Sequence, residues 1–229
     1  MKKKNLSVKK KIHNFYFKKL EDPRIKKIYL NFKKKIFKNI PNSFCVAVSG
    51  GSDSMALSFL AKCYSIENNK KVYFYIVDHK IRKNSTFEAT LVKKKLKSFQ
   101  IFSKILTIKK ENISKNIQSF ARDNRYKLII KQSLIKKIDM ILTAHHTDDL
   151  IENFFIRLLR GSGLKGLISF SKIKSKVIFD DKIFILRPLL DTPKKDLIYI
   201  SKNTFNFNVN DPSNLDDKFL RVKVRKLIL

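Results

Sequence analysis

The chain has 229 residues, a hydrophobic content of 43% and a formal net charge of +32, so it is long enough to fold as one large domain with its own core. It contains no apolar run of the roughly 20 residues that span a bilayer, its charged N-terminus lacks the apolar stretch of a secretory signal, and its 2 cysteines are too few for a disulfide framework. We therefore expect a protein of the reducing cytoplasm with no membrane partner.

The lysine surplus has two interpretations that composition alone leaves equally open. A strongly basic surface is typical of proteins that bind nucleic acid. The chain is also rich in Lys, Asn, Ile and Phe and poor in Gly, Pro and Trp, a bias that codon usage toward A and T would produce. The charge therefore supports an RNA-binding function only together with other evidence.

Apolar periodicity predicts an α/β fold. Residues 1–40 form a Lys-rich N-terminal extension in which helical spacing predicts a helix over 24–38. Apolar runs predict strands at 43–48, 72–77, 103–108 and 139–144, and helices at 54–66, 86–99, 116–137 and 148–160. This alternation is typical of a parallel sheet flanked by helices, which we assign to one domain, 41–229.

The C-terminal part of the chain has a different pattern. Two short strands around Asp180 and Asp181 predict a hairpin over 176–190. A polar turn follows it, and the chain finishes with a basic and apolar segment.

Polar motifs follow three of the predicted strands. SGGSDS (49–54), DHKIR (78–82) and HHTDD (145–149) come directly after apolar runs. Ligands of open α/β sheets bind beyond the carboxyl ends of the strands. The three motifs therefore predict one crevice at that edge.

The SGGSDS motif joins a strand to a helix. Gly50 and Gly51 allow a sharp turn, and the backbone N–H groups beside the helix N-terminus suit a phosphate. The motif lacks the Gly-Lys-Ser/Thr ending of a Walker A loop. Asp53 would repel a phosphate unless a cation intervened, so we expect Mg²⁺ there. The competing interpretation is a helix cap formed by Ser52 or Asp53.

The segments DHKIR and ARDNRY (121–126) carry weaker signals. Asp78 and His79 end a strand and Arg82 follows them, while Arg122 and Arg125 lie three residues apart on one helix face. Arginine suits bidentate phosphate contacts. The alternatives are a turn-forming Asp78, a structural His79 and a surface ion pair with Asp123.

The segment TAHHTDDLIENFFIRLLRGSG (143–163) is the second strong signal. Asp149 and Glu152 lie at i and i+3, so both carboxylates should face the crevice from the first turn of a helix. The alternative is that these acids complement the helix dipole. Six apolar residues should form the buried face of this helix: Leu150, Ile151, Phe154, Phe155, Leu158 and Leu159. Zinc is disfavoured because HExxH is absent, whereas carboxylates suit Mg²⁺.

The motif VAVSGGSDSMAL resembles the signature of the PP-loop ATP pyrophosphatases. Together with the HHTDD…RLLRGSG block, RPLL (187–190) and DPSNLDDKFLRVKVR (211–225), it is similar to the tRNA(Ile)-lysidine synthetase branch of that superfamily over about 45–225. The resemblance implies the adenine nucleotide alpha hydrolase-like fold. It also implies that the further C-terminal tRNA-binding domains usual in the branch are absent here.

The resemblance implies a two-step reaction. The oxygen on carbon 2 of the wobble cytidine, in an isoleucine tRNA with a CAU anticodon, attacks the α-phosphate of ATP and releases pyrophosphate. The ε-amine of free lysine then displaces AMP and gives lysidine. The implied partners are ATP, Mg²⁺, L-lysine and tRNA, and a homodimer is left open.

The motifs and the resemblance together predict the site residues. We assign catalysis to Asp53, Asp149, Glu152, Arg122 and His145; ATP binding to Ser49, Gly50, Gly51, Ser52, Asp53, Ser54, Asp78 and His79; and lysine or tRNA contacts to Arg82, Arg125, His146, Asp148, Arg160 and Arg187. The metal ligand is Asp53.

Two other functions compete with this hypothesis. A tRNA thiolase of the same superfamily would need reactive cysteines, but Cys45 lies inside a predicted strand and Cys63 on the next helix. A basic tRNA-binding protein that kept the fold without catalysis is the second alternative. Lysine-dependent release of AMP separates all three.

Overall fold

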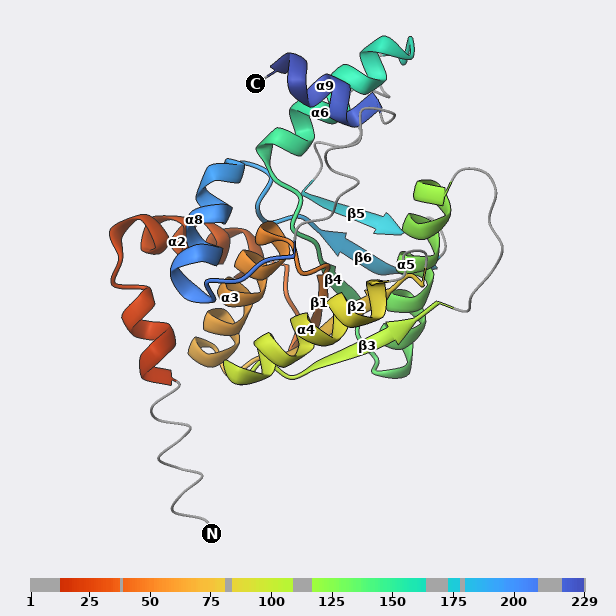
Figure 1. Ribbon diagram of the computed structural model, residues 1–229. Helices are drawn as coiled ribbons and strands as arrows, with labels where there is room; N and C mark the ends of the chain where they lie inside the picture. Colours follow the sequence, from red (N-terminus) through yellow and green to blue (C-terminus); the bar gives the residue numbers. More distant parts are fainter. Residues whose placement is uncertain are drawn as a thin grey trace.

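A computed structural model describes residues 13–37, 39–80, 84–108, 117–163, 173–177, 180–209 and 220–228. A six-stranded sheet runs through its centre in the order β3-β2-β1-β4-β6-β5 (Figure 1). The strands are β1 Ser43–Val48, β2 Lys71–Asp78, β3 Ser103–Thr107, β4 Met140–Leu142, β5 Lys174–Val177 and β6 Asp180–Leu186. Five of them are parallel, and β5 pairs antiparallel with β6.

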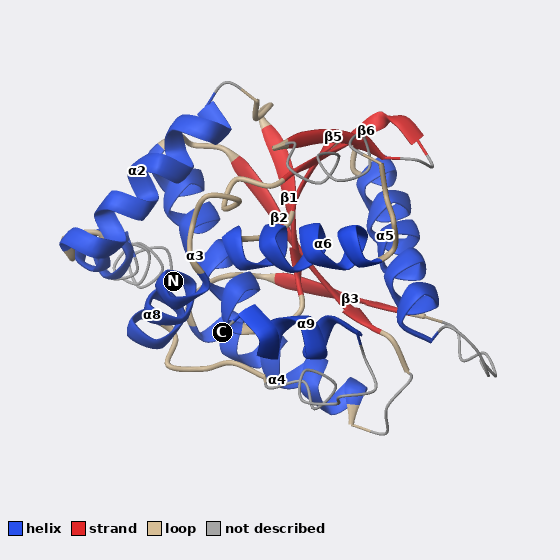
Figure 2. Ribbon diagram, turned by 90° about the horizontal axis from the view of Figure 1, so that it is seen from above, coloured by secondary structure: helices blue, strands red, loops and turns tan. Residues whose placement is uncertain are grey.

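Helices cover both faces of this sheet, as Figure 2 shows. The labelled helices are α2 Pro23–Phe37, α3 Ser52–Glu67, α4 Ser85–Ser98, α5 Ile117–Ile135, α6 Thr147–Leu159, α8 Lys194–Thr204 and α9 Leu220–Ile228, and residues 13–19 are also helical. Side chains of β1 alternate between the faces: Phe44, Val46 and Val48 join one buried cluster, and Cys45 joins the other. The larger cluster lies under α2, α3, α4 and α8, and the smaller one lies under α5. The α/β fold with a parallel sheet flanked by helices is confirmed.

The predicted hairpin is confirmed, and it has a larger role than expected. Strand β6 pairs in parallel with β4, so the hairpin extends the main sheet. The sequence pattern places Asp180 and Asp181 in its turn, but β6 begins at Asp180. Helices α8 and α9 were not predicted from the sequence, although α8 buries residues at helical spacing: Leu197, Ile200, Ser201 and Thr204.

Helix α2 is part of the main core. Ile25, Ile28, Tyr29, Phe32 and Ile36 are buried in the cluster that also contains the inner side chains of β1 and α3. The described part of the Lys-rich extension therefore belongs to the same core as β1 and α3. The boundary at residue 40 stays a prediction.

The predicted buried face of α6 is wrong. Ile151, Phe154, Phe155, Leu158 and Leu159 are exposed by 39 to 65%, and Glu152 is the buried residue of this helix. Both views place α6 above the carboxyl edge of the sheet with α9 beside it (Figures 1 and 2). Because the helix projects beyond the sheet, its apolar stripe does not reach the core.

None of the helices within the described residues has both the length and the apolar composition needed to cross a membrane.

Candidate active site

The loop after β1 is shaped by Gly50 and Ser54. Gly50 has φ of +91°, and a Cβ built on it would lie 2.5 Å from Val92 Cγ2. The Ser54 hydroxyl accepts hydrogen bonds from the N–H groups of Ser49 (3.2 Å) and Gly50 (3.0 Å) and donates to Gly51 O (3.0 Å). Ser54 therefore holds the loop in shape from inside.

The N-terminus of α3 begins directly behind this loop. Gly51 is the N-cap, with no side-chain cap, so the interpretation of Ser52 or Asp53 as the cap is wrong. Ser52 and Asp53 are the first residues of the helix instead. The first-turn N–H groups and the helix dipole form a site suited to a phosphate.

Asp53, His146 and Asp149 form the centre of the site. His146 is 2% exposed, and its Nε2 lies 3.6 Å from Asp53 Oδ2 and 3.4 Å from Asp149 Oδ2. His146 also caps α6, where its Nδ1 accepts from Asp149 N at 3.4 Å. One imidazole thus joins the start of α3 to the first turn of α6.

The charges of this group support one another. Burial alone would raise the pKa of Asp53, but His146 and Lys194 outweigh it and lower that pKa, so the carboxylate is ionised. Burial lowers the pKa of His146, but Asp53 and Asp149 outweigh it and raise that pKa. The imidazole therefore acts as a buried internal partner of the carboxylates.

A Mg²⁺ ion fits the residues present, provided that phosphate oxygens complete its shell. Within the described residues, no group of three or more His, Cys, Asp or Glu side chains is placed to enclose a metal. Asp53 keeps 28% of its side-chain surface exposed beside the loop. One or two carboxylates together with substrate phosphates are a usual Mg²⁺ shell.

Glu152 has a different environment from Asp149. It is 3% exposed and accepts two hydrogen bonds from Arg225, at 2.6 and 3.0 Å. Arg221 Nε lies 2.9 Å from the same carboxylate, and Arg221 Nη2 lies 3.5 Å from Asp149 Oδ1. The buried carboxylate of Glu152 on α6 thus pairs with two partly exposed arginines of α9.

Sequence reasoning missed Arg221 and Arg225. They lie four residues apart on one face of a helix, and that spacing matches the i, i+3 carboxylates Asp149 and Glu152 across α6. Two arginines at this spacing indicate a basic helix face, but no local pattern specifies which carboxylates that face meets.

A second group lies at the end of β2. Asp78 is 2% exposed and accepts hydrogen bonds from the hydroxyls of Ser85 and Thr86, each at 2.7 Å. Burial would raise its pKa, but these hydrogen bonds lower it overall. The Nε2 atom of the neighbouring His79 lies 2.9 Å from Arg125 Nη2. Asp78 therefore anchors the start of α4, while His79 and Arg125 meet at the rim.

A third group surrounds His145 with positive charge. Its Nδ1 lies 2.9 Å from Thr143 Oγ1. Burial first, and then the positive charges of Arg187, Arg122 and Arg221, lower the pKa of His145 to about 3. The imidazole is therefore neutral, and the arginines around it favour an anion.

The remaining predicted residues are spread more widely. Asp148 Oδ1 accepts from Lys194 N at 3.2 Å, which ties α6 to the start of α8. Arg160 is exposed at the far end of α6. Arg82 lies outside the described residues, as does the DPSN segment, 211–214.

Both cysteines are buried away from this crevice. Cys45 is inside β1 and Cys63 on α3. Burial raises the pKa of the Cys45 thiol to about 12 and that of Cys63 well above its usual value. Thiols in this state are poor nucleophiles and poor metal ligands.

In a comparison with known protein families, residues 22–229 match the PP-loop domain family. A tRNA(Ile)-lysidine synthase of Orientia tsutsugamushi is 38% identical over 184 residues, which is 80% of this chain and 40% of that protein. One from Rickettsia typhi is 36% identical over 81% of this chain and 42% of its own length. The chain thus spans about two fifths of the curated relatives it matches.

Solved structures share the fold at low identity. The U34-tRNA thiolase NcsA from Methanococcus maripaludis, described with its 4Fe-4S cluster, superimposes with a TM-score of 0.73 at 19% identity, over 89% of this chain and 71% of that one. NMN synthetase from Francisella tularensis gives a TM-score of 0.52 at 11% identity, over 87% and 75%.

Proposed function

Because this chain belongs to the PP-loop domain family, we propose that it is an ATP-dependent ligase that joins lysine to the wobble cytidine of an isoleucine tRNA. The curated relatives at 36 to 38% identity carry the name tRNA(Ile)-lysidine synthase. The proposed products are lysidine, AMP and pyrophosphate. The proposed setting is the cytoplasm, and assembly as a homodimer stays a prediction.

One observation carries the proposal. The single Nε2 atom of His146 lies within 3.6 Å of Asp53 and 3.4 Å of Asp149. The phosphate loop and the carboxylate that would receive a lysine ammonium therefore belong to one connected group. A reaction that joins an adenylated base to an amine needs the ATP-binding site and the lysine-binding site close together.

The loop residues would bind and orient the triphosphate. The N–H groups at the start of α3 would donate to the phosphate, and Gly50 lets the backbone turn without a side chain in the way. Asp53 would hold Mg²⁺, which offsets negative charge on a leaving pyrophosphate when bound. The guanidinium groups of Arg122 and Arg187 near His145 would stabilise charge that develops on the α-phosphate.

Asp149 is better placed than Glu152 to receive the lysine. Glu152 is already held by two hydrogen bonds from Arg225, whereas Asp149 keeps 16% of its side-chain surface exposed. Asp149 would hold the incoming ammonium and accept the proton that the amine must lose before it attacks. Glu152, through Arg221, would position Asp149.

The test is the formation of AMP from ATP with an isoleucine tRNA transcript, with and without L-lysine. We expect AMP release to depend on both tRNA and lysine, and to be lost in Asp53→Asn while the variant still folds. Asp139→Asn is the matched control. Asp139 is exposed and directly precedes Met140, the first residue of β4, so it lies at the end of that strand away from His146. AMP release that does not depend on lysine, or that continues in Asp53→Asn, would refute the assignment.

A further inference from the structure

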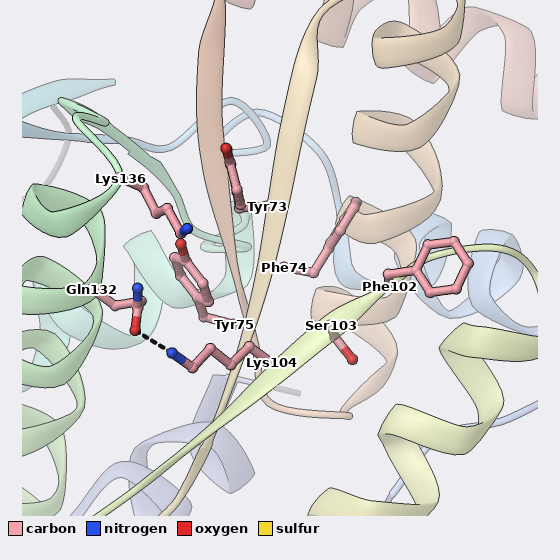
Figure 3. Close-up of a pocket in the computed structure, with 8 residues that line it drawn as sticks. All are labelled: Tyr73, Phe74, Tyr75, Phe102, Ser103, Lys104, Gln132 and Lys136. Carbon is pink, nitrogen blue, oxygen red and sulfur yellow. Dashed lines mark hydrogen bonds between the residues drawn. The ribbon is translucent and has the colours of Figure 1, made fainter.

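A cavity of about 210 Å³ opens on the side of the sheet away from the phosphate loop. It lies between the first half of β2, the start of β3 and the C-terminal end of α5, with lining residues Tyr73, Phe74, Tyr75, Phe102, Ser103, Lys104, Gln132 and Lys136 (Figure 3). Asp78, at the carboxyl end of the same β2 strand, belongs to the candidate active site. The cavity is therefore a separate place on the molecule.

The polar groups that surround the cavity are mainly hydrogen-bond donors. Lys104 Nζ donates to Gln132 Oε1 at 2.6 Å, and Figure 3 shows the Gln132 amide nitrogen turned away from Lys104. Lys136 adds a second ammonium group, and none of the described lining residues is acidic. Such a lining suits negatively charged oxygens.

The hydroxyl of Tyr75 is the informative feature of the cavity. Tyr75 is 2% exposed, and its buried Oη has no hydrogen-bond partner within the described structure. Other tyrosines do have partners: Tyr16 donates to Phe99 O at 2.7 Å, and Tyr199 donates to Asp22 Oδ2 at 2.8 Å. Buried hydroxyls are rarely left without an acceptor, so this one indicates a ligand.

Tyr75 keeps the hydrogen that lets it donate in this position. Burial raises the pKa of its phenol well above the usual value, so the O–H group stays protonated at neutral pH. Figure 3 shows this hydroxyl and the Lys136 side chain directed into the same space between β2 and α5. A neutral donor beside a cation is the arrangement that binds an oxyanion.

The wall of the cavity is aromatic. The rings of Tyr73 and Tyr75 are stacked, with centroids 6.4 Å apart and planes at 25°, whereas the Phe102 ring, 66% exposed, points to the opposite side of β2 and β3 (Figure 3). Aromatic rings next to lysines are the usual way in which proteins hold the base and the phosphate of a nucleotide.

We propose that this cavity binds the phosphate of a nucleotide, with Tyr75 and Lys136 as donors and the partly buried Tyr73 ring in its wall. The cavity is smaller than the roughly 300 Å³ at which pockets for drug-sized ligands begin, so it seats the phosphate and only part of the base. The nucleotide is either free in solution or one residue of an RNA strand. Binding at this cavity is independent of the proposed ligase function.

The test measures binding of inorganic phosphate, AMP and a short single-stranded RNA to the full chain by titration calorimetry. Tyr75→Phe and Lys136→Gln each remove one donor, and Lys131→Gln is the matched control, since Lys131 is exposed on α5 but does not line the cavity. We expect one binding event to weaken about tenfold or more in Tyr75→Phe and Lys136→Gln. It should be unchanged in Lys131→Gln.

Two further readouts keep the result specific. ATP-dependent pyrophosphate release should be unaffected in both cavity variants, because the phosphate loop is intact. If AMP and inorganic phosphate compete for the same site, the ligand of the cavity is a free nucleotide. If only the RNA binds, the ligand is one residue of an RNA strand. Equal binding of all three probes to wild type, Tyr75→Phe and Lys136→Gln would overturn the proposal and leave water as the partner of Tyr75.

Discussion

Gly50 lies in a position where neither the backbone conformation nor the surroundings admit a side chain. Its φ of +91° is unfavourable for other residues, and an added Cβ would meet Val92 at 2.5 Å and Val209 at 3.3 Å. Gly51, next to it, has a φ of −67° and only Ser49 Oγ at 3.8 Å near its Cβ position. The two glycines of the loop thus differ in their tolerance of alanine.

We therefore predict that Gly50→Ala loses about 2–4 kcal/mol of unfolding free energy and its ATP binding, from overpacking and strain together. Gly51→Ala should keep the stability of the wild type within about 1 kcal/mol. Urea unfolding measures the stability of each variant, and nucleotide titration measures its ATP binding. Equal stability of the two variants would show that the loop relaxes around Gly50.

Glu152 is a second residue whose environment makes a clear prediction. Removing one partner of a fully buried ion pair costs about 3–5 kcal/mol. Arg225 keeps 22% of its side-chain surface exposed, so we expect about 2–3 kcal/mol for Glu152→Ala, because solvent partly screens the arginine left behind. Glu21→Ala, at an exposed carboxylate, is the control.

The same variant tests whether Glu152 positions Asp149. Arg221 contacts both carboxylates, at 2.9 and 3.5 Å. Under conditions where Glu152→Ala is folded, we expect the KM for lysine to rise. A destabilised variant with an unchanged KM would limit Glu152 to holding α9 on α6.

Helix α2 shows how local sequence signals act at the scale of an element. Asp22 Oδ1 accepts from the N–H groups of Arg24 (2.9 Å) and Ile25 (3.0 Å), and Pro23 follows as the first helical residue. This is the cap and proline order that favours a helix start. Tyr199 of α8 donates to the other carboxylate oxygen at 2.8 Å.

Asp22 therefore predicts a pH dependence of stability. The hydrogen bonds from Ile25 and Tyr199 lower its pKa in the folded state, so its contribution is complete above the unfolded value near 4 and is lost as pH falls through the lower, folded pKa. We expect Asp22→Ala to cost about 1 kcal/mol at pH 7. The difference between wild type and Asp22→Asn should shrink in acid, as denaturant unfolding across pH can show; a constant difference would contradict the cap.

Helix α6 shows where element-level prediction fails. Its start was predicted well, because His146 and the acids that follow it act within one turn. Its apolar stripe was predicted to be buried, yet Leu159 is 65% exposed. Periodicity shows that a helix has an apolar face, and only the tertiary arrangement decides what covers that face.

At the scale of the molecule, the strands of the sheet were predicted from the sequence, and two of the polar motifs that follow them meet where His146 lies near Asp53 and Asp149. Strand ends carried the polar motifs, and the adjacency of β2, β1, β4 and β6 brings them together. Contacts between distant segments were not predictable. The pairing of Glu152 with Arg225 joins residues 73 positions apart, and no local pattern specifies such a partner.

The lysine surplus is also a question for the whole molecule. On α2, Arg24, Lys33 and Lys35 pair with Asp196, Glu67 and Asp191, so part of the basic surface is used in holding helices together. Tyr16 is fully buried and stacks on Phe59 at 5.5 Å. Deletion of residues 1–22 would therefore damage the core and the α2 cap as well as remove charge.

Charge neutralisation is a cleaner test of the N-terminal segment. Lys2, Lys3, Lys4, Lys9, Lys10 and Lys11 lie outside the described residues, and we predict that changing them to Gln weakens tRNA binding. The slope of log K against log salt should flatten by roughly 0.7 to 0.9 for each phosphate that the variant no longer neutralises, with ATP binding unchanged. An unaltered slope would assign these lysines to composition bias.

The most direct test of the proposed function is the chemical identity of the wobble base after reaction. The full chain is incubated with an isoleucine tRNA transcript bearing a CAU anticodon, ATP, Mg²⁺ and L-lysine, and the digested nucleosides are analysed by mass spectrometry. We predict that one anticodon cytidine carries lysine, only when ATP and lysine are both present and only while Asp53 is intact. An unmodified cytidine, or a base that has gained sulfur instead, would contradict the proposed function.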